Sequence, residues 1–209
     1  MPTVEQAREW YPADDPVHGF DHVLRVMRSA EEIGEELGAD LEVLRAAALL
    51  HDAAGADPRE NRAEHENASA EFAQKLLGEE GWPEERVHAV TECIVSHRYR
   101  GKQRPKSLEA KILFDSDKLD VIGAFGVART LGYAMQAGQP MFAEPSDHFM
   151  ETGQTNPGEP HSAYHEYLFK LRNVRDRLHT DPARRLAAER EQVLVSFFEQ
   201  LAAEARGDR

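Results

Sequence analysis

The stretch from Ala46 to Asp52 constrains the fold most strongly, because it joins a fully apolar run to a charged pair. Ala46-Ala47-Ala48-Leu49-Leu50 is apolar on every side of a helix and is followed at once by His51-Asp52. A helix that is apolar all round belongs in the centre of a protein. An ionised carboxylate at the edge of such a core is costly unless a partner compensates for it. The sequence therefore predicts a central helix that ends in either a hydrogen-bonded His-Asp pair or a metal site.

The rest of the chain also has the pattern of helices, and no segment shows the sustained alternation of a half-buried strand. Apolar positions three and four residues apart, with Gly and Pro at the breaks, mark these helices. They are expected at 20–37, 41–51 behind an Asp40 cap, 63–77, from Pro83 onward, behind a Ser107 cap, and at 119–136, 164–178 and 182–203. We therefore expect an all-α fold, a compact bundle of roughly eight helices.

The chain shows no internal repeat and no sharp linker, so we expect a single domain over residues 1–209. Within it we expect a core at about 18–135, an irregular loop at 138–160 and C-terminal helices at 163–206. The loop holds four prolines and three glycines. A connection of this length is unusual in a compact domain, so it is either an exposed insertion or an active-site lid.

Composition excludes several classes of function. The chain has 38 acidic and 25 basic residues and a net charge of −13, which disfavours nucleic acids and anionic membranes as partners. Its only cysteine, Cys93, excludes an internal disulfide framework and an all-cysteine zinc site. The sequence has neither a membrane-spanning apolar run nor a signal-peptide core. We expect a cytoplasmic protein.

Several polar side chains fall on the apolar faces of their helices. His22 precedes Val26 by four residues, His97 follows Ile94 by three, and Asp117 follows Leu113 by four. Inward imidazoles and carboxylates from different helices would be satisfied together by one divalent centre. The alternative is a separate buried hydrogen-bond pair for each residue.

Three motifs carry a resemblance to a known family. They are His18-Gly19-Phe20-Asp21-His22, Ala47-Ala48-Leu49-Leu50-His51-Asp52 and Phe114-Asp115-Ser116-Asp117-Lys118-Leu119-Asp120. This ordered set resembles the HD-domain metal-dependent phosphohydrolase superfamily, and residues 121–129 resemble its small bacterial branch. The resemblance implies that His22, His51, Asp52 and Asp117 are the primary metal ligands.

Two further histidines bear on the number of metal ions. His65 opens a segment similar to the His-x-x-x-small-Ala segment of HD proteins that bind two metals, and His97 is similar to the next histidine of that set. If both carry over, six ligands suit a dinuclear centre. Relatives in the small branch often lack the first of these histidines, so the resemblance leaves one or two ions open. It does not distinguish Mn, Mg, Co, Fe, Ni and Zn.

Substrate contacts are expected beside these ligands. Lys118 directly follows Asp117 and could neutralise charge on a phosphate, while Asp52 would bind metal and help to orient a water. Arg98 opens a run of five cations that ends at Lys106, which is either a phosphate-binding loop or a solvated turn. The small branch tends to carry a late histidine where this chain has Ala163. His161 or His165 could replace it.

The resemblance implies a hydrolase that acts on a small phosphorylated substrate, a nucleotide. Some members of the branch release pyrophosphate from nucleoside triphosphates. The alternatives are a nucleotide phosphomonoesterase, a dinucleoside polyphosphate hydrolase, a nucleotide-sensing module without turnover, and a dinuclear-iron oxygenase. The oligomeric state is left open.

Overall fold

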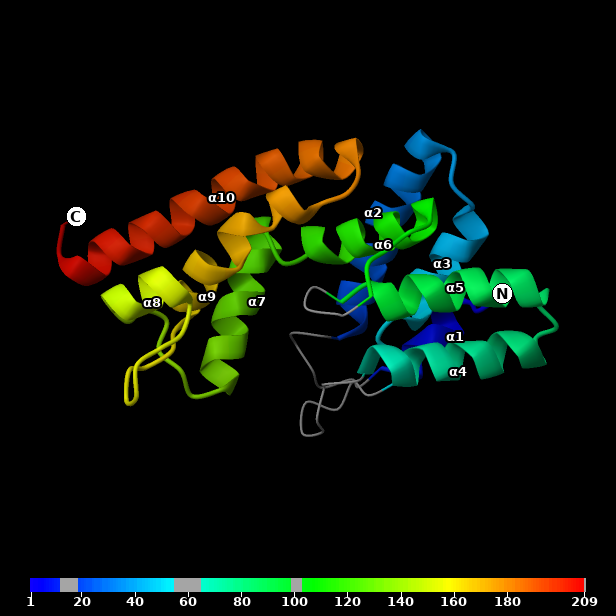
Figure 1. Cartoon of the computed structure of the whole chain (residues 1–209), viewed down its shortest axis with the longest axis horizontal. Coiled ribbons are helices and arrows are strands. Elements are labelled where there is room, and N and C mark those ends of the chain that lie inside the picture. Colours follow the sequence, from blue (N-terminus) through cyan, green and yellow to red (C-terminus); the bar gives the residue numbers. More distant parts are fainter. Residues whose placement is uncertain (12–18, 55–64, 99–102, 209) are drawn as a thin grey trace. The chain divides into compact units, whose positions relative to one another are not determined.

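The computed structural model describes residues 1–11, 19–54, 65–98 and 103–208. His18, Arg100 and Lys102, which the sequence motifs include, lie outside these ranges. The described residues form ten α-helices and two 3₁₀ turns without any strand, which confirms the all-α prediction (Figure 1). The elements are α1 Val4–Arg8, α2 Phe20–Leu37, α3 Leu41–Leu50, α4 His65–Glu79, α5 Glu84–Ser96, α6 Leu108–Leu119, α7 Gly123–Gln136, α8 Asp147–Thr152, α9 Ala163–Phe169, η2 Leu171–Asn173, η3 Arg175–Arg177 and α10 Asp181–Arg206.

The chain forms two compact units. The first consists of Met1–Lys118 together with Leu178–Ala183, and the second of Leu119–Arg177 together with Arg184–Arg209. Each unit is described by itself below. The expectation of a single domain over the whole chain stays a prediction.

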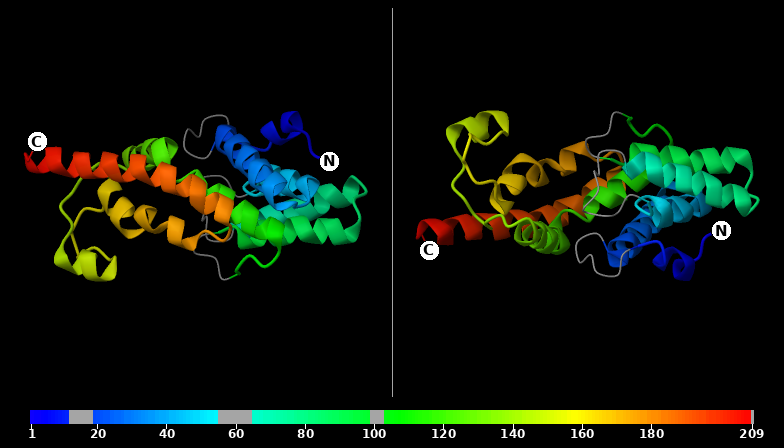
Figure 2. Two further views of the ribbon diagram at one scale, coloured as in Figure 1. Left: turned by 90° about the horizontal axis from the view of Figure 1, so that it is seen from above. Right: turned by 90° about the horizontal axis from the view of Figure 1, so that it is seen from below.

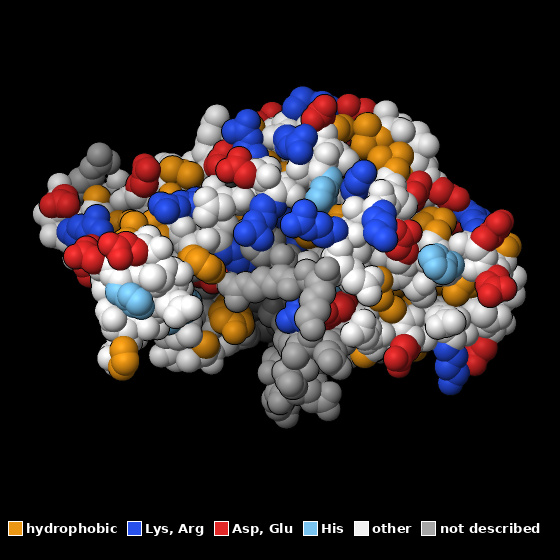
Figure 3. All heavy atoms as spheres, viewed as in Figure 1, with side chains coloured by type: hydrophobic (Ala, Val, Ile, Leu, Met, Phe, Trp, Pro, Cys, Tyr) orange, Lys and Arg blue, Asp and Glu red, His pale blue; other side chains and the backbone are white. Residues whose placement is uncertain are grey.

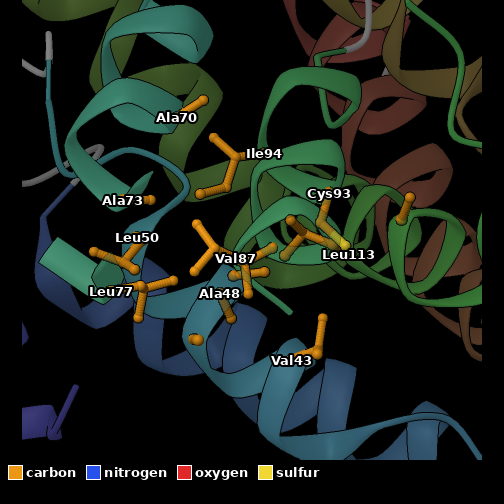
Figure 4. Close-up of a cluster of buried hydrophobic side chains, with 14 of the residues drawn as sticks. Val43, Ala48, Leu50, Ala70, Ala73, Leu77, Val87, Cys93, Ile94 and Leu113 are labelled. Atoms are coloured by element: carbon orange, nitrogen blue, oxygen red, sulfur yellow. The ribbon is translucent and has the colours of Figure 1, made fainter. Parts of the chain in front are cut away.

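Helix α3 is the centre of the first unit. It packs against α2 and α5, while α4 and α5 lie along each other (Figure 2). The side chains of Ala46, Ala47, Ala48 and Leu50 have no exposed surface, as the apolar run predicts. Figure 4 shows how apolar side chains of α3, α4, α5 and α6 point toward one another in this core. The apolar run is therefore surrounded by other helices, and His51 and Asp52, which follow it, are buried as well.

Local signals in the sequence place the ends of α2 and α3. Gly38 takes the left-handed conformation after α2, with φ of 70°. Asp40 then caps α3, because its carboxylate accepts hydrogen bonds from the amides of Glu42 and Val43. The expected cap at Ser107 is also confirmed, since its hydroxyl accepts from the Ala110 amide at 3.2 Å.

Other helix boundaries differ from the predictions. Helix α4 continues past Gly78 to Glu79, because a single glycine weakens a packed helix without ending it. Helix α7 begins at Gly123 and not near Leu119, after a turn in which Gly123 has φ of 72°. The helix expected at 164–178 ends at Phe169, and two 3₁₀ turns follow it.

The segment 138–160 is ordered, and the prediction of an irregular loop is wrong in part because the segment contains α8. Glu159 joins the start of α8 to the residues that follow this helix. Its carboxylate accepts from the Ser146 amide at 2.9 Å, the Ser146 hydroxyl at 2.8 Å and the Asn156 amide at 2.7 Å. These backbone amides hold the pKa of the Glu159 carboxyl at about 2. These hydrogen bonds, together with the buried ring of Phe149, hold the segment in place.

The surface carries charges of both signs. Asp and Glu side chains alternate with Lys and Arg side chains over the face in Figure 3. Within the described part of the chain, no helix combines the length and the apolar character that crossing a bilayer requires.

We predict that Gly126→Ala destabilises the protein by about 1–3 kcal/mol, the usual range for overpacking. A Cβ at this position would clash with the carbonyl oxygen of Val121, which belongs to the backbone and cannot rotate away. Thermal unfolding would measure the change. Gly78→Ala is the matched control, because a Cβ there meets no atom within 4 Å and alanine favours the helix. Equal melting temperatures for the two variants would contradict the prediction.

Candidate metal centre

All six predicted metal ligands lie in the first unit, and all six are held out of water. They come from five parts of the chain: His22 from α2, His51 and Asp52 from the end of α3, His65 from the start of α4, His97 from the residue after α5, and Asp117 from α6. None of these side chains is more than 13% exposed. The structure therefore brings together residues that are separated by up to 95 positions (22 to 117) in the sequence.

The first group of ligands surrounds His22. Its Nε2 lies 3.4 Å from His51 Nε2 and 3.5 Å from Asp117 Oδ1. His51 Nε2 in turn lies 3.8 Å from Asp52 Oδ2. One ligand atom each from His22, His51 and Asp52 falls within 4.8 Å of the others. These atoms converge on one point, as ligands of a single ion must.

The second group surrounds Asp52 on its other side. Asp52 Oδ1 lies 3.4 Å from His65 Nε2 and 3.5 Å from His97 Nε2, and these three atoms also fall within 4.8 Å of one another. Among the described residues, Asp52 Oδ1 is buried and makes no hydrogen bond. A buried carboxylate oxygen of this kind is unusual, since such atoms are normally satisfied. Asp52 thus belongs to both groups and presents one oxygen to each.

Backbone contacts fix which ring nitrogens are available as ligands. Nδ1 of His51 lies 2.8 Å from the carbonyl of Ala48, and Nδ1 of His97 lies 2.5 Å from that of Ile94. A carbonyl only accepts, so in both rings Nδ1 carries the proton and Nε2 is left with its lone pair. Both Nε2 atoms point into the centre. This arrangement is the one found for histidines that bind metals through Nε2.

The electrostatics of the centre favour neutral imidazoles beside ionised carboxylates. Burial lowers the pKa of His51 to about 4, although Asp52 acts in the opposite direction. Burial raises the pKa of Asp52, but His51, His65 and His97 outweigh it and bring this pKa well below its usual value. Neutral nitrogen and anionic oxygen are the states in which these groups bind a cation. The donor set therefore fits a divalent metal, and it could hold two ions that share Asp52.

Residues that the sequence argument missed hold the His51-Asp52 turn in place. The Tyr11 hydroxyl donates to the carbonyl of Leu49 at 2.9 Å, at the open end of α3. Ser69 of α4 accepts from the Ala54 amide at 3.1 Å and donates to the Ala54 carbonyl at 2.9 Å. Ser69 occupies the small position of the His-x-x-x-small-Ala segment, one turn after His65. Ser69 thus ties α4, the helix that begins with His65, to the turn that carries Asp52.

The predicted substrate contacts lie beside the centre and are already paired. Lys118 is 7% exposed, and its ammonium group forms an ion pair with Asp117 Oδ2 and lies 5.4 Å from the ring of Phe114. Lys118 is therefore not a solvated surface lysine. Nη1 of Arg98 lies 3.2 Å from Oε1 of Glu66, a carboxylate that the sequence argument also missed.

His161 and His165 lie in the second unit, where His165 is buried. Its Nδ1 lies 2.7 Å from the Ser162 hydroxyl, and its ring packs against Phe149 with centroids 4.4 Å apart. Burial lowers the pKa of His165. The ring of His165 is therefore held by contacts with Ser162 and Phe149 within the second unit. A substrate role for either histidine stays a prediction.

Asp115 is the member of the Asp115-Ser116-Asp117 motif that faces away from the metal ligands. It accepts hydrogen bonds from the amides of His179 and Thr180, both at 2.8 Å, and from the Thr180 hydroxyl at 2.7 Å. Asp115 therefore fastens the returning segment Leu178–Ala183 to α6. No sequence signal near residue 115 reveals this contact, because its donors lie more than 60 residues away.

Comparison with known proteins identifies the class. The sequence matches the HD domain over residues 19–122, a range that contains all six ligands. It is also 32% identical to YpgQ of Bacillus subtilis, an uncharacterized protein, over 204 residues that cover 94% of this chain and 91% of YpgQ. The chain therefore belongs to the HD-domain family.

Solved structures agree with this assignment. The crystal structure of Bacillus subtilis YpgQ in complex with ADP is 28% identical, covers 97% of each chain and gives a TM-score of 0.72. A protein from Lactobacillus plantarum is 28% identical, with 98% of this chain and 95% of that chain covered and a TM-score of 0.76. A predicted HD superfamily hydrolase from an uncultured Thermotogales bacterium is 30% identical, with 96% and 90% covered and a TM-score of 0.65.

We predict that Ser69→Ala destabilises the protein by about 1–3 kcal/mol, because it leaves both polar groups of Ala54 without a partner. We also expect it to weaken Mn²⁺ binding, since the contact holds the turn that carries Asp52 against the helix that carries His65. Chemical denaturation and titration calorimetry would measure the two effects. Ser196→Ala, at an exposed position of α10, should change neither. Unchanged Mn²⁺ affinity in Ser69→Ala would show that the contact only stabilises the fold.

Proposed function

We propose that this protein is a metal-dependent phosphohydrolase that acts on a small nucleotide, with release of pyrophosphate from a nucleoside triphosphate as its reaction. The observation that carries the proposal is the pair of ligand groups that share Asp52. His22, His51, Asp52 and Asp117 would hold one divalent cation, and Asp52, His65 and His97 a second. Divalent ions in such sites polarise phosphoryl oxygens and lower the pKa of water to near neutrality.

The protein's own residues would hold this chemistry in place. Tyr11 binds the carbonyl of Leu49 and Ser69 binds the amide of Ala54. These hydrogen bonds hold the backbone before and after Asp52. Lys118 fixes Asp117 through their ion pair and adds positive charge where charge accumulates on a phosphate. Because Lys118 is buried, its charge is screened by water far less than that of a surface lysine.

Two observations support a nucleotide as the substrate. YpgQ, which aligns with this chain over almost its whole length, has been crystallised with ADP. Arg98, the residue after the ligand His97, has a side chain that is 31% exposed and can therefore reach a bound phosphate. A guanidinium group binds phosphate through two parallel hydrogen bonds.

We predict that Asp52→Asn abolishes metal-dependent turnover without unfolding the protein, because both ligand groups lose their shared carboxylate. The assay is release of phosphate or pyrophosphate from a panel of nucleotides, with Mg²⁺, Mn²⁺ or Co²⁺ added in turn. His97→Ala should lower the stoichiometry of bound Mn²⁺ by one ion. His88→Ala, at an exposed position of α5, the helix that His97 directly follows, is the matched control and should behave as the wild type.

The products separate the alternatives. Pyrophosphate supports the proposal, whereas orthophosphate alone would replace it with a phosphomonoesterase. Bound metal without release from any nucleotide would favour the sensing module or, if the protein absorbs visible light, an iron-dependent oxygenase. Activity that survives in Asp52→Asn would refute the metal centre.

We predict that, with Mn²⁺ at saturating concentration, Arg98→Ala raises KM by about 10–100-fold and lowers kcat much less. A charge-assisted contact to phosphate contributes about 1.5–3 kcal/mol and serves ground and transition states alike. Steady-state kinetics on the nucleotide identified above would measure both constants. Arg104→Ala, in the same basic run but at an exposed position, is the control. An unaltered KM in Arg98→Ala would show that Arg98 pairs with Glu66 but does not contact the substrate.

A further inference from the structure

The carboxylate of Glu66 contacts a candidate metal ligand and a candidate substrate contact at once. Its Oε2 lies 3.5 Å from Nδ1 of His65, and its Oε1 lies 3.2 Å from Nη1 of Arg98. The Glu66 side chain is only 12% exposed, whereas Glu71 on the same helix faces solvent. A carboxylate that gives up most of its hydration needs such charged partners.

Glu66 takes the place that a backbone carbonyl has for the other histidines. His51 and His97 each donate Nδ1–H to the carbonyl three residues earlier, which leaves Nε2 free for the centre. Nδ1 of His65, the first residue of α4, lies 3.5 Å from the carboxylate oxygen Oε2 of Glu66. A carboxylate beside Nδ1 attracts the ring proton to that nitrogen and leaves the lone pair of Nε2 toward Asp52.

Arg98 holds the carboxylate in this orientation. Its guanidinium lies 3.2 and 3.4 Å from the two oxygens of Glu66. The contact joins the residue after His97 to the residue after His65, so it also ties together the two histidines of the second ligand group. The chain of contacts therefore runs from Asp52 through His65 and Glu66 to Arg98.

We propose that Glu66 is a positioning residue that sets the tautomer of His65 and thereby the affinity of the second cation site, formed by Asp52, His65 and His97. This inference rests on the proposed function, since it concerns the second of the two ions. It goes further by assigning a role to a residue that touches neither the ions nor the reacting phosphate.

The test uses Mn²⁺ alone as the probe, with the full-length protein in the metal-free state. Titration calorimetry and electron paramagnetic resonance would compare the wild type with Glu66→Gln, which keeps the size of the side chain and removes its charge. Glu66→Gln should weaken one of two Mn²⁺ sites by about 10–100-fold and leave the other unchanged, the usual cost of losing an outer partner of a ligand. Glu66→Asp should restore part of this loss, and Glu71→Gln should have no effect.

A second readout does not depend on metal. Long-range ¹H–¹⁵N correlation spectra report which nitrogen of His65 is protonated. The Nδ1–H form should dominate in the wild type and decline in Glu66→Gln. An unchanged tautomer together with unchanged binding of both ions would overturn the inference.

Failure of the inference can be told apart from failure of the proposed function. If the wild type binds one Mn²⁺ and still hydrolyses nucleotides, the inference is refuted and the hydrolase stands. If the wild type binds two Mn²⁺ ions that depend on Glu66 but turns over no nucleotide, the inference stands and the proposed reaction is refuted. If the wild type binds no Mn²⁺, both are refuted.

Discussion

The structure of the first unit depends on the burial of one carboxylate, that of Asp52. Moving an ionised carboxylate out of water costs several kcal/mol even after relaxation. Asp52 nevertheless follows directly on a helix whose Ala46–Leu50 stretch is almost completely buried. Imidazole nitrogens of His51, His65 and His97 lie near the carboxylate and offset part of the cost of burying it. Tyr11 and Ser69 hold the backbone on either side of it. The helices of this unit are arranged so that their polar ends meet at Asp52.

Much of this arrangement could be predicted from the sequence. The apolar run fixed the central place of α3, and helical spacing was enough to show that His22, His97 and Asp117 point inward. The caps at Asp40 and Ser107 are local effects, so they too could be predicted. The resemblance to HD proteins supplied His65, which spacing alone did not single out because it stands at a helix start.

What could not be predicted are the contacts between residues far apart in the chain. Spacing singled out Asp117 as an inward residue, yet Asp115 is buried as well and binds the amides of His179 and Thr180. Nothing in the helical pattern distinguishes Ser69 or Glu66, because their partners Ala54 and Arg98 lie in other parts of the chain. The segment 138–160 is held in part by Glu159, and two of the three donors to its carboxylate are backbone amides, which side-chain patterns do not reveal.

The contact between Asp115 and the segment Leu178–Ala183 has a consequence for how the chain can be divided. The first unit is discontinuous, since the chain leaves it after Lys118, returns for a few residues and leaves again. A fragment that stops near residue 122, where the HD match ends, would keep all six ligands but would strip Asp115 of its three donors. The first compact unit is therefore longer than the range that matches the HD domain, because it is completed by Leu178–Ala183.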